Sequence, residues 1–365
     1  MTTPHLFEPI TIRGMEVRNR LWVPPMCQYS AAPAGAGLGV PTDWHRSHWA
    51  ALGRGGAGLI VVEATGVTPE GRISTQCLGL WNDAQERAFA DMLPAAKAHG
   101  ARFALQLGHA GRKGSTPPWL PGAPTGSVPH DQHGWQTVAP SAIALPGLAE
   151  PRALDTDEVW GVVEAFRAAA TRAVRAGFDA VEIHSAHGYL IHEFLSPLSN
   201  HRTDEFGGSL ENRARLLREV VRGVRGDHHD LPVFVRISGD EWVEGGFGVD
   251  EAAQVARWVA LDGADFIDAS SGGNVVDAPI PVGPAYQVPI AARLRDAGVP
   301  IGAVGLITTP EVAEAILTTG QADVISVGRP LLTNPFLPLH WAHRLGFDGA
   351  ADLVPGQFHR ARFGA

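Results

Sequence analysis

Short apolar runs recur along the chain, and longer stretches with apolar residues at three- and four-residue spacing separate them. The runs are rich in Val, Ile, Leu or Phe and apolar on both faces, which is the pattern of buried parallel strands. They cover residues 58–63, 102–107, 180–184, 232–237, 266–270, 300–304 and 323–327. A weaker run at 21–24 brings the predicted strands to eight.

Amphipathic helices are predicted between these strands. They cover residues 84–99, 156–176, 210–225, 249–262 and 310–319. Asp155 or Thr156 can cap one helix start, and Gly177 follows the end of the same helix. Strands alternating with helices, with no G-x-G-x-x-G fingerprint at any helix start, indicate an α/β fold of the closed (β/α)8 TIM-barrel type. We expect one domain over residues 1–365.

Two segments do not follow the strand–helix alternation. Residues 7–20 form two short alternating segments around Arg13-Gly14, which predicts a β-hairpin that plugs the barrel floor. Residues 111–150 are rich in Gly, Pro, Ser, His and Trp and have no helical period. They predict a long loop after strand three, on the face where barrel enzymes carry their sites.

The charge of the chain limits its partners. With 29 Lys and Arg against 38 Asp and Glu, the net charge is −9, which argues against nucleic acid or an anionic membrane as the main partner. No apolar run approaches the ~20 residues of a membrane-spanning helix, and the N-terminus does not resemble a signal peptide. Cys27 and Cys77 are too few for a disulfide framework. We expect a cytoplasmic protein.

Polar residues at the carboxyl ends of barrel strands are the candidates for chemistry. In strand order these ends carry Met26, Cys27 and Tyr29, then Glu63-Ala64, then Gln106, His109 and Lys113, then His184, His187 and Tyr189, then Arg236, Gly305 and Gly328-Arg329. None is specific alone, but together they predict a polar ring around one mouth of the barrel.

The most informative cluster is His184-Ser-Ala-His187-Gly-Tyr189. The two imidazoles could ligate a metal, hydrogen-bond a substrate oxygen or pack in a turn. A metal would need ligands at other strand ends, yet Arg236 and Arg329 would repel a cation, so we predict no metal. Tyr189 keeps its proton at neutral pH and suits a proton donor.

An anionic cofactor is indicated by the two arginines. Arg236 ends an apolar strand and needs an anionic or electron-rich partner, because an unpaired buried guanidinium is costly. Gly328-Arg329, with Gly305 on the neighbouring loop, has the position of the phosphate site that many barrels build after their last strands, although Arg329 could also form a surface salt bridge. With Gln106 between them, these residues suggest FMN.

Four segments resemble the Old Yellow Enzyme family of ene-reductases: Pro24-Pro-Met-Cys-Gln-Tyr29, Gln106 with 109–113, 184–189, and the specific run 192–208. The likeness extends from residue 7 past Arg329, and Cys27 points to the thermophilic-like or xenobiotic-reductase branch. The resemblance implies an FMN barrel that takes hydride from NADPH or NADH. Such an enzyme reduces activated C=C bonds of α,β-unsaturated carbonyl and nitro compounds by ping-pong turnover.

The resemblance also implies residue roles. FMN would be bound by Pro24, Pro25, Met26, Cys27, Ala64, Gln106, Arg236, Gly305, Gly328 and Arg329, and the substrate by Tyr29, Lys113, His184, His187 and Arg360. Of these, His184 and His187 would anchor the activating oxygen, while Cys27 would tune the flavin. Tyr189 would protonate the α-carbon. Arg360 would reach the neighbouring subunit's site in a homodimer or a dimer of dimers.

Two other functions fit part of the sequence. A dienoyl-CoA-reductase-like flavoenzyme would share the barrel, but such relatives carry an extra domain and an iron–sulfur cluster, and two cysteines cannot ligate a four-cysteine cluster. A metal-assisted barrel hydrolase or lyase would use His184 and His187 as ligands. The segment 115–135 is longer than in shorter family members, so it concerns pocket size and substrate preference, not the reaction class.

Overall fold

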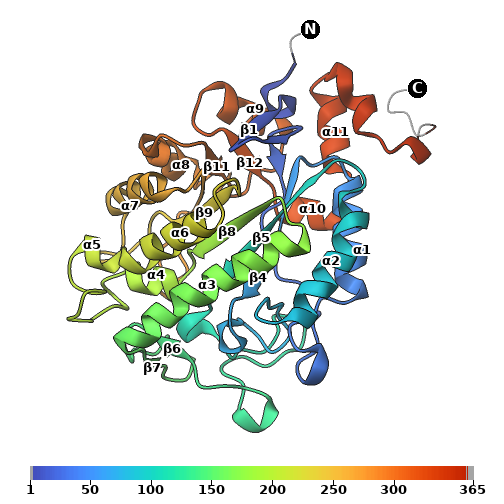
Figure 1. Cartoon of the computed structure of the whole chain (residues 1–365). Helices are drawn as coiled ribbons and strands as arrows, with labels where there is room; N and C mark the ends of the chain where they lie inside the picture. Colours follow the sequence, from blue (N-terminus) through green and yellow to red (C-terminus); the bar gives the residue numbers. More distant parts are fainter. Residues whose placement is uncertain (1–2, 359, 361–365) are drawn as a thin grey trace.

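Eight parallel strands form the barrel at the centre of the molecule (Figure 1), in a computed structural model that describes residues 3–358 and 360. The strands are β3 (Leu21–Trp22), β4 (Leu59–Gly66), β5 (Arg102–Gly108), β8 (Ala180–Ser185), β9 (Val233–Ser238), β10 (Phe266–Ser270), β11 (Ile301–Ala303) and β12 (Val324–Ser326). They pair in the order β3-β12-β11-β10-β9-β8-β5-β4, and a bridge between Val23 and Ile60 joins the two ends of the sheet. The predicted TIM barrel is confirmed.

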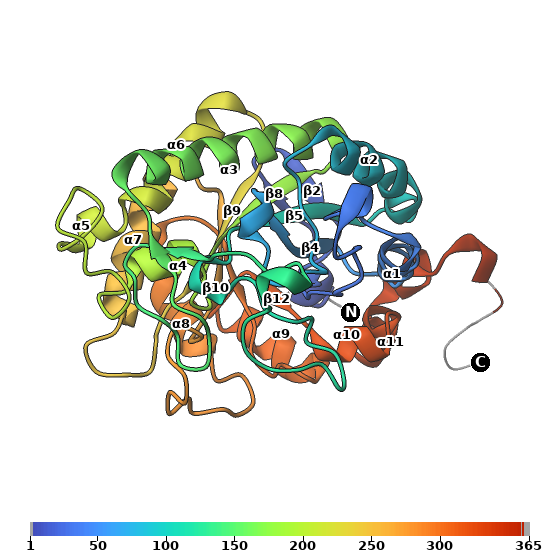
Figure 2. The ribbon, with the colours of Figure 1, turned by 90° about the horizontal axis from the view of Figure 1, so that it is seen from below.

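Helices surround the strands, as Figure 2 shows from the end of the barrel. They are α1 (Asp43–Arg54), α2 (Asp83–Lys97), α3 (Thr156–Ala176), α4 (Leu190–Leu195), α5 (Leu210–Arg213), α6 (Arg215–Asp227), α7 (Val249–Asp262), α8 (Val288–Leu294), α9 (Pro310–Thr318), α10 (Arg329–Thr333) and α11 (Leu337–Arg344). The side chain of Asp155 accepts a hydrogen bond from the backbone N–H of Glu158 and caps α3, and Gly177 ends it in the left-handed conformation.

The N-terminal hairpin closes one end of the barrel. Its strands β1 (Ile10–Ile12) and β2 (Met15–Val17) are antiparallel, and the turn residues Arg13 and Gly14 both have positive φ, as tight hairpin turns require. The buried side chains of the hairpin pack with an apolar layer inside the barrel that includes Trp22, Phe234 and Phe266. This arrangement confirms the predicted plug.

The long loop after β5 is anchored to the segment that follows β4. Trp135 Nε1 donates a hydrogen bond to the carbonyl of Glu70, and its ring stacks 4.5 Å from the Arg72 guanidinium. The two ends of the 115–135 segment are joined to each other, because the N–H of Trp135 donates a hydrogen bond to Ser115 Oγ at 2.9 Å. Further along, β6 (Val138–Ala139) pairs with β7 (Arg152–Ala153).

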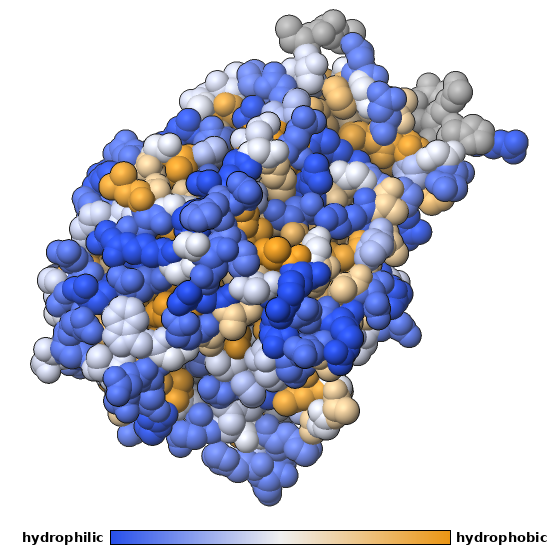
Figure 3. All heavy atoms as spheres, in the orientation of Figure 1, coloured by the Kyte–Doolittle hydropathy of each residue, from blue (hydrophilic) through white to orange (hydrophobic). Residues whose placement is uncertain are grey.

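Hydrophilic residues cover most of the face seen in Figure 3, and hydrophobic residues lie between them in small groups. None of the helices in the described part of the chain is long and apolar enough to cross a membrane.

Candidate active site

A cavity of about 570 Å³ opens at the carboxyl ends of β3, β9, β11 and β12. Seven of the residues predicted to hold FMN line it: Pro24, Pro25, Met26, Arg236, Gly305, Gly328 and Arg329. Its size lies within the range of about 300 to 1,000 Å³ that is usual for ligand pockets. Residues predicted from their positions at the ends of strands, in four separate parts of the chain, therefore line one cavity.

Arg236 is buried, with 6% of its surface exposed, and its Nε lies 3.1 Å from Asp268 Oδ2 on the neighbouring strand. The sequence interpretation required an anionic partner for this guanidinium but did not identify Asp268. Because Arg236 also lines the cavity, its charge faces both the aspartate and any ligand there.

Gln106 is not among the residues that line this cavity. It lies on β5, inside the barrel. Its Nε2 donates to Glu182 Oε1 at 2.8 Å, and both side chains are buried. Burial, and then the charge of Asp268, raise the pKa of Glu182 to about 8. Glu182 was a second residue that the strand-end rule missed.

The loop after β11 also contributes residues that were not predicted. Leu306, Ile307 and Thr308 line the cavity directly after Gly305, so the rule that found Gly305 could have found them. Gly305 has a φ of 114°, and a Cβ there would lie 2.9 Å from Gln287 Nε2. Gln287 lines the cavity just before α8, where no sequence signal pointed.

His184, His187 and Tyr189 come together at the turn after β8. The His184 ring centroid lies 5.2 Å from that of His187 and 5.0 Å from that of Tyr189. His184 and Tyr189 line a second, smaller pocket together with Ala64 and His109. His187 Nε2 lies 2.7 Å from Ser270 Oγ. The predicted trio is therefore one cluster, with Ala64 beside it.

Burial sets the protonation of this cluster. It is the main cause that lowers the pKa of both His184 and His187 well below the ordinary value, with the charge of Arg236 second. Burial likewise raises the pKa of Tyr189 well above its ordinary value. The histidines are therefore neutral hydrogen-bond partners at pH 7, and the tyrosine keeps its proton.

The backbone of the turn is held from several sides. Lys113 Nζ donates to the carbonyls of His187 and Gly273, each at 2.7 Å, and the N–H of His187 donates to Ser238 Oγ at 2.9 Å. Burial lowers the pKa of Lys113 to about 8. These contacts make Lys113 a support of the turn, while its direct contact with a substrate stays a prediction.

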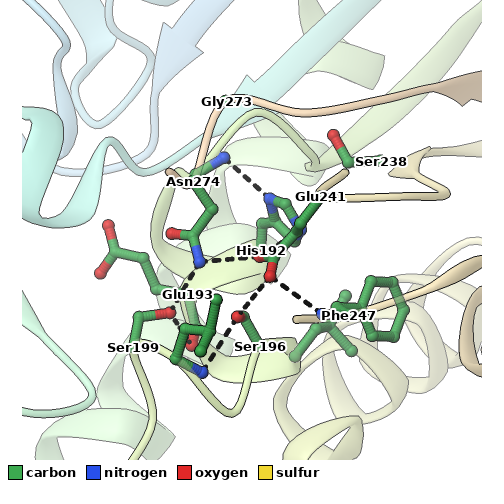
Figure 4. A network of polar contacts seen from close by, with 12 residues as sticks. His192, Glu193, Ser196, Ser199, Ser238, Glu241, Phe247, Gly273 and Asn274 are labelled. Atoms are coloured by element: carbon green, nitrogen blue, oxygen red, sulfur yellow. Dashed lines mark hydrogen bonds and ion pairs between the residues drawn. The ribbon is translucent and has the colours of Figure 1, made fainter. Parts of the chain in front are cut away.

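A buried polar network supports the same turn from behind (Figure 4). The N–H of Gly188 donates to His192 Nδ1 at 2.8 Å, and His192 Nε2 lies 3.3 Å from Glu241 Oε1. Glu241 also accepts hydrogen bonds from Ser196 Oγ at 2.9 Å and from Asn274 Nδ2 at 2.7 Å. None of these partners was predicted as a site residue. Glu241 and Asn274 are distant in sequence from the turn, whereas His192 is only four residues from Gly188.

Cys27 lies beside Cys77. A hydrogen bond between the two thiols is the main cause that raises the pKa of Cys27 well above its ordinary value, followed by burial. Cys77 is buried, and its Sγ lies 3.2 Å from Ser74 Oγ. Tyr29 hydrogen-bonds Cys27, and its pKa is raised chiefly by burial. Cys27 and Tyr29 are thus half-buried neighbours in one environment.

Arg360 does not join the site of its own chain. It is exposed and follows α11 and a short 3-10 turn (Gly356–Phe358), and this C-terminal segment lies on the outside of the barrel in Figure 2. Within the described residues, no group of three or more His, Cys, Asp and Glu side chains could hold a metal ion.

Comparison with known proteins identifies the family. Residues 5–346 match the NADH:flavin oxidoreductase / NADH oxidase family. The chain belongs to this family. It is an enzyme, a flavin-dependent oxidoreductase with FMN as cofactor and a nicotinamide nucleotide as hydride donor.

Relatives of this flavin oxidoreductase match along its whole length. It is 44% identical to an NADPH dehydrogenase of Halalkalibacterium halodurans, covering 98% of each chain. It is 43% identical to an NADPH dehydrogenase of Bacillus subtilis, covering 97% of this chain and 98% of the relative.

Solved structures confirm the fold and place it among Old Yellow Enzyme homologues. Morphinone reductase aligns with a TM-score of 0.77 at 31% identity, covering 94% of this chain and 90% of that one. The old yellow enzyme homologue from Zymomonas mobilis aligns with a TM-score of 0.76 at 31% identity, covering 93% of each chain. A 2-naphthoyl-CoA reductase aligns at 0.83 and 25% identity, but this chain spans 53% of it.

The cavity fits the FMN of this family. Arg236 and Arg329 place two guanidinium groups on its wall, which suits a ligand with an electron-rich ring edge and a phosphate. The positive φ of Gly305 disfavours a residue with a Cβ, and such a Cβ would crowd the Gln287 side chain on the same cavity wall. The donor set and the shape therefore agree with the cofactor.

Proposed function

We propose that this flavin oxidoreductase is an ene-reductase of the Old Yellow Enzyme type. It would reduce activated C=C bonds of α,β-unsaturated carbonyl and nitro compounds, with hydride from NADPH or NADH. The observation that carries the proposal is the cluster of two neutral histidines and a protonated tyrosine next to the cofactor cavity. Such a cluster can bind an oxygen and supply a proton, which are the two tasks that alkene reduction leaves to the protein.

The cofactor would be held along the 570 Å³ cavity. Pro24, Pro25, Met26 and Cys27 would contact its ring from one side, with Ala64 nearby. Gln106 would hydrogen-bond the pyrimidine edge, Arg236 would face the N1–C2=O end, and the phosphate would lie at Gly305, Gly328 and Arg329. When bound, FMN accepts hydride from the nicotinamide and delivers it to the β-carbon of the alkene.

The side chains above the cofactor would act on the substrate. His184 and His187 would hydrogen-bond the carbonyl or nitro oxygen and stabilise its developing negative charge. Tyr189 would give its proton to the α-carbon. Tyr29 would line the pocket, and Lys113 would hold the His187 carbonyl in place. Since the nicotinamide would use the same pocket before the alkene enters, turnover would be ping-pong.

The tyrosine role has a direct test. In Tyr189→Phe, anaerobic flavin reduction by NADPH should keep its rate within about threefold, whereas reoxidation by an enone should slow by about 10² to 10⁴, the usual contribution of general acid catalysis. Stopped-flow absorption at the flavin band measures both half-reactions. Equal loss of both would refute the proton-donor role, and a colourless protein with metal-dependent activity would refute the flavin assignment and favour a hydrolase or lyase.

We also propose a homodimer or a dimer of dimers in which Arg360 reaches the partner's pocket. Arg360 is exposed and follows a segment that lies outside its own barrel, which supports this role. Arg360→Ala should raise the KM for an enone by about tenfold with unchanged FMN content, since one charge-assisted hydrogen bond would be lost. The matched control is Arg344→Ala, because Arg344, the last residue of α11, pairs with Glu311 of α9. A monomer in analytical ultracentrifugation would contradict the assembly.

A further inference from the structure

Four polar side chains form one layer inside the barrel: Gln106 on β5, Glu182 on β8, Arg236 on β9 and Asp268 on β10. Each stands two residues further along its strand than a member of the apolar floor layer, which includes Ala104, Ala180, Phe234 and Phe266. Because side chains alternate along a strand, the four point to the interior as the floor residues do.

The layer consists of two pairs. Gln106 lies opposite Glu182 in the β5–β8 register, and its Nε2 donates to Glu182 Oε1 at 2.8 Å. Asp268 lies opposite Arg236 in the β10–β9 register, and Arg236 Nε lies 3.1 Å from Asp268 Oδ2. All four side chains are nine-tenths buried or more, and Asp268 Oδ1 has no hydrogen-bond partner among the described residues.

Stability does not explain this layer. Interior layers of such barrels are usually filled by Val, Ile and Leu, and a buried ion pair is often no more stable than apolar residues of the same volume. Two carboxyl groups and one guanidinium share this interior, and one carboxylate oxygen is unpaired. A costly arrangement next to the cofactor cavity indicates a role in the chemistry there.

The charges in the layer can be assigned. The groups that face Glu182 are Gln106, Arg236 and Asp268, and burial together with Asp268 raises the pKa of Glu182 to about 8. Glu182 is therefore neutral at pH 7. Burial raises the pKa of Asp268, and the guanidinium of Arg236, whose Nε lies 3.1 Å away, counteracts that rise. Of the two carboxyl groups, Asp268 is the one paired with a cation, so we assign the negative charge to it. The Arg236–Asp268 pair then has no net charge, although Arg236 alone would present a cation to the cavity.

The amide of Gln106 has a defined orientation. Its NH₂ group is taken by Glu182, and no described donor reaches its carbonyl oxygen. A flavin ring offers one N–H on its pyrimidine edge, which would need an acceptor such as this oxygen. Glu182 therefore selects which end of the amide is available to a ligand.

We propose that Asp268 and Glu182 are positioning residues for the cofactor: Asp268 orients Arg236 and offsets its charge, which lowers the reduction potential of the flavin, and Glu182 orients the Gln106 amide. This inference rests on the proposed placement of FMN in the cavity. Neither residue would touch the substrate. Both act through a side chain that would contact the flavin ring.

The test of Asp268 is the midpoint potential of the bound FMN, measured by dye equilibration of the holoenzyme. Asp268→Asn removes the charge and keeps the shape, so Arg236 should stabilise the reduced flavin more strongly. We expect at least a tenfold shift of the redox equilibrium toward the reduced form, which for a two-electron couple is about 30 mV more positive.

The matched control is Asp265→Asn. Asp265 directly precedes β10 and pairs with Arg225 and Arg13 at the opposite end of the barrel. This variant should lower the melting temperature and leave the potential unchanged. If Asp268→Asn only loses stability or FMN content, and the FMN that remains keeps the wild-type potential, the proposal for Asp268 is overturned.

Glu182 is tested by FMN affinity, from the fluorescence quenching of free FMN on addition of enzyme stripped of its cofactor. Glu182→Gln mimics the neutral acid and keeps an acceptor for Gln106, so the Kd should stay within about threefold. Glu182→Leu removes the acceptor and should weaken binding by about tenfold or more. Equal affinities in both variants would overturn the role of Glu182, and a shift of potential in Glu182→Gln as large as in Asp268→Asn would overturn the charge assignment.

The failure of this inference differs from a failure of the proposed function. A wild-type protein that binds FMN and reduces enones, but whose potential is insensitive to Asp268→Asn, would refute the inference alone. A protein that binds no FMN would refute the placement of the cofactor and both proposals with it.

Discussion

The turn at His187 and Gly188 shows how much backbone constraint the site imposes on single residues. His187 has a φ of 62°, in the left-handed region that non-glycine residues rarely adopt. Gly188 has a φ of 71°, and a Cβ there would lie 2.3 Å from the carbonyl oxygen of Gly273. The turn is therefore fixed by conformation and by contact, and Lys113 holds both carbonyls.

Gly188→Ala should damage the turn in both ways. The left-handed conformation costs about 1 to 2 kcal/mol for a residue with a Cβ, and the clash adds to it. Since His187 and Tyr189 flank the substitution, reoxidation by enones should fall at least tenfold while flavin reduction is affected less. Gly177→Ala is the control, because its φ is 95° and a Cβ there meets nothing within 4 Å. Thermal denaturation and stopped-flow absorption check both variants, and equal activities would contradict the role of the close contact.

At the scale of elements, the sequence was most informative where both ends of an element carry a signal. The bounds of α3 matched the prediction because Asp155 and Gly177 mark its two ends. In contrast, α4 was not predicted, because all six of its residues are buried and the segment has no polar face to create a helical period. Helix α8 was also not predicted, because it is only seven residues long and contains Pro289, so its sequence shows no helical period.

Candidate site residues followed the same logic. Gly305 was found because it follows an apolar run and Arg236 because it is a cation near the end of one, and the cavity contains both. Glu182 and Asp268 stand inside their strands, so a rule that reads strand ends passed over them, although a carboxylate within a buried apolar run was a readable signal. The contacts of His192 and of Asn274 with Glu241 depend on how distant segments pack, which no local pattern encodes.

We expect the N-terminal hairpin to stabilise the fold without affecting cofactor binding, and this can be tested. Ile12 is 2% exposed and packs into the floor layer, so Ile12→Ala should cost about 2 to 5 kcal/mol of unfolding free energy. Its neighbour Thr11 is exposed, and Thr11→Ala should change stability by no more than about 0.5 kcal/mol. Because the hairpin lies at the end opposite the cavity, FMN content per folded protein should be unchanged in both variants. Denaturant titration with a flavin assay measures this, and a loss of FMN from folded Ile12→Ala would contradict it.

At the scale of the whole molecule, buried ionisable groups set the pH dependence of stability. Burial raises the pKa values of Glu182 and Glu193 to about 8, so the folded state keeps protons that the unfolded state loses, and stability falls as pH rises from about 4.5 to 8. Burial lowers the pKa of His109 to about 4 and of His192 to about 3, so stability falls as pH drops below about 6.5.

The melting temperature should therefore be highest near pH 6.5, because protonation of the buried histidines opposes folding below that pH and ionisation of the buried carboxyl groups opposes it above that pH. Glu193→Gln mimics the protonated acid and should flatten the decrease between pH 6.5 and 8. Because unfolded Glu193 already ionises above about pH 4.5, the variant should also steepen the loss of stability between pH 6.5 and 4.5. Calorimetry from pH 4 to 8 at constant ionic strength measures this. A decrease of the same slope in the variant would show that Glu193 is not the group responsible.

The two ends of the 115–135 segment meet, so this segment is a loop that is joined to the barrel at one place. Because Trp135 is hydrogen-bonded to Ser115, the chain leaves the barrel and returns to it at nearly the same point. Residues between these two positions can be lengthened, shortened or replaced without requiring the strands to move. The fold thus separates the barrel, which carries the cofactor cavity, from a rim that can change in length and sequence without moving the strands.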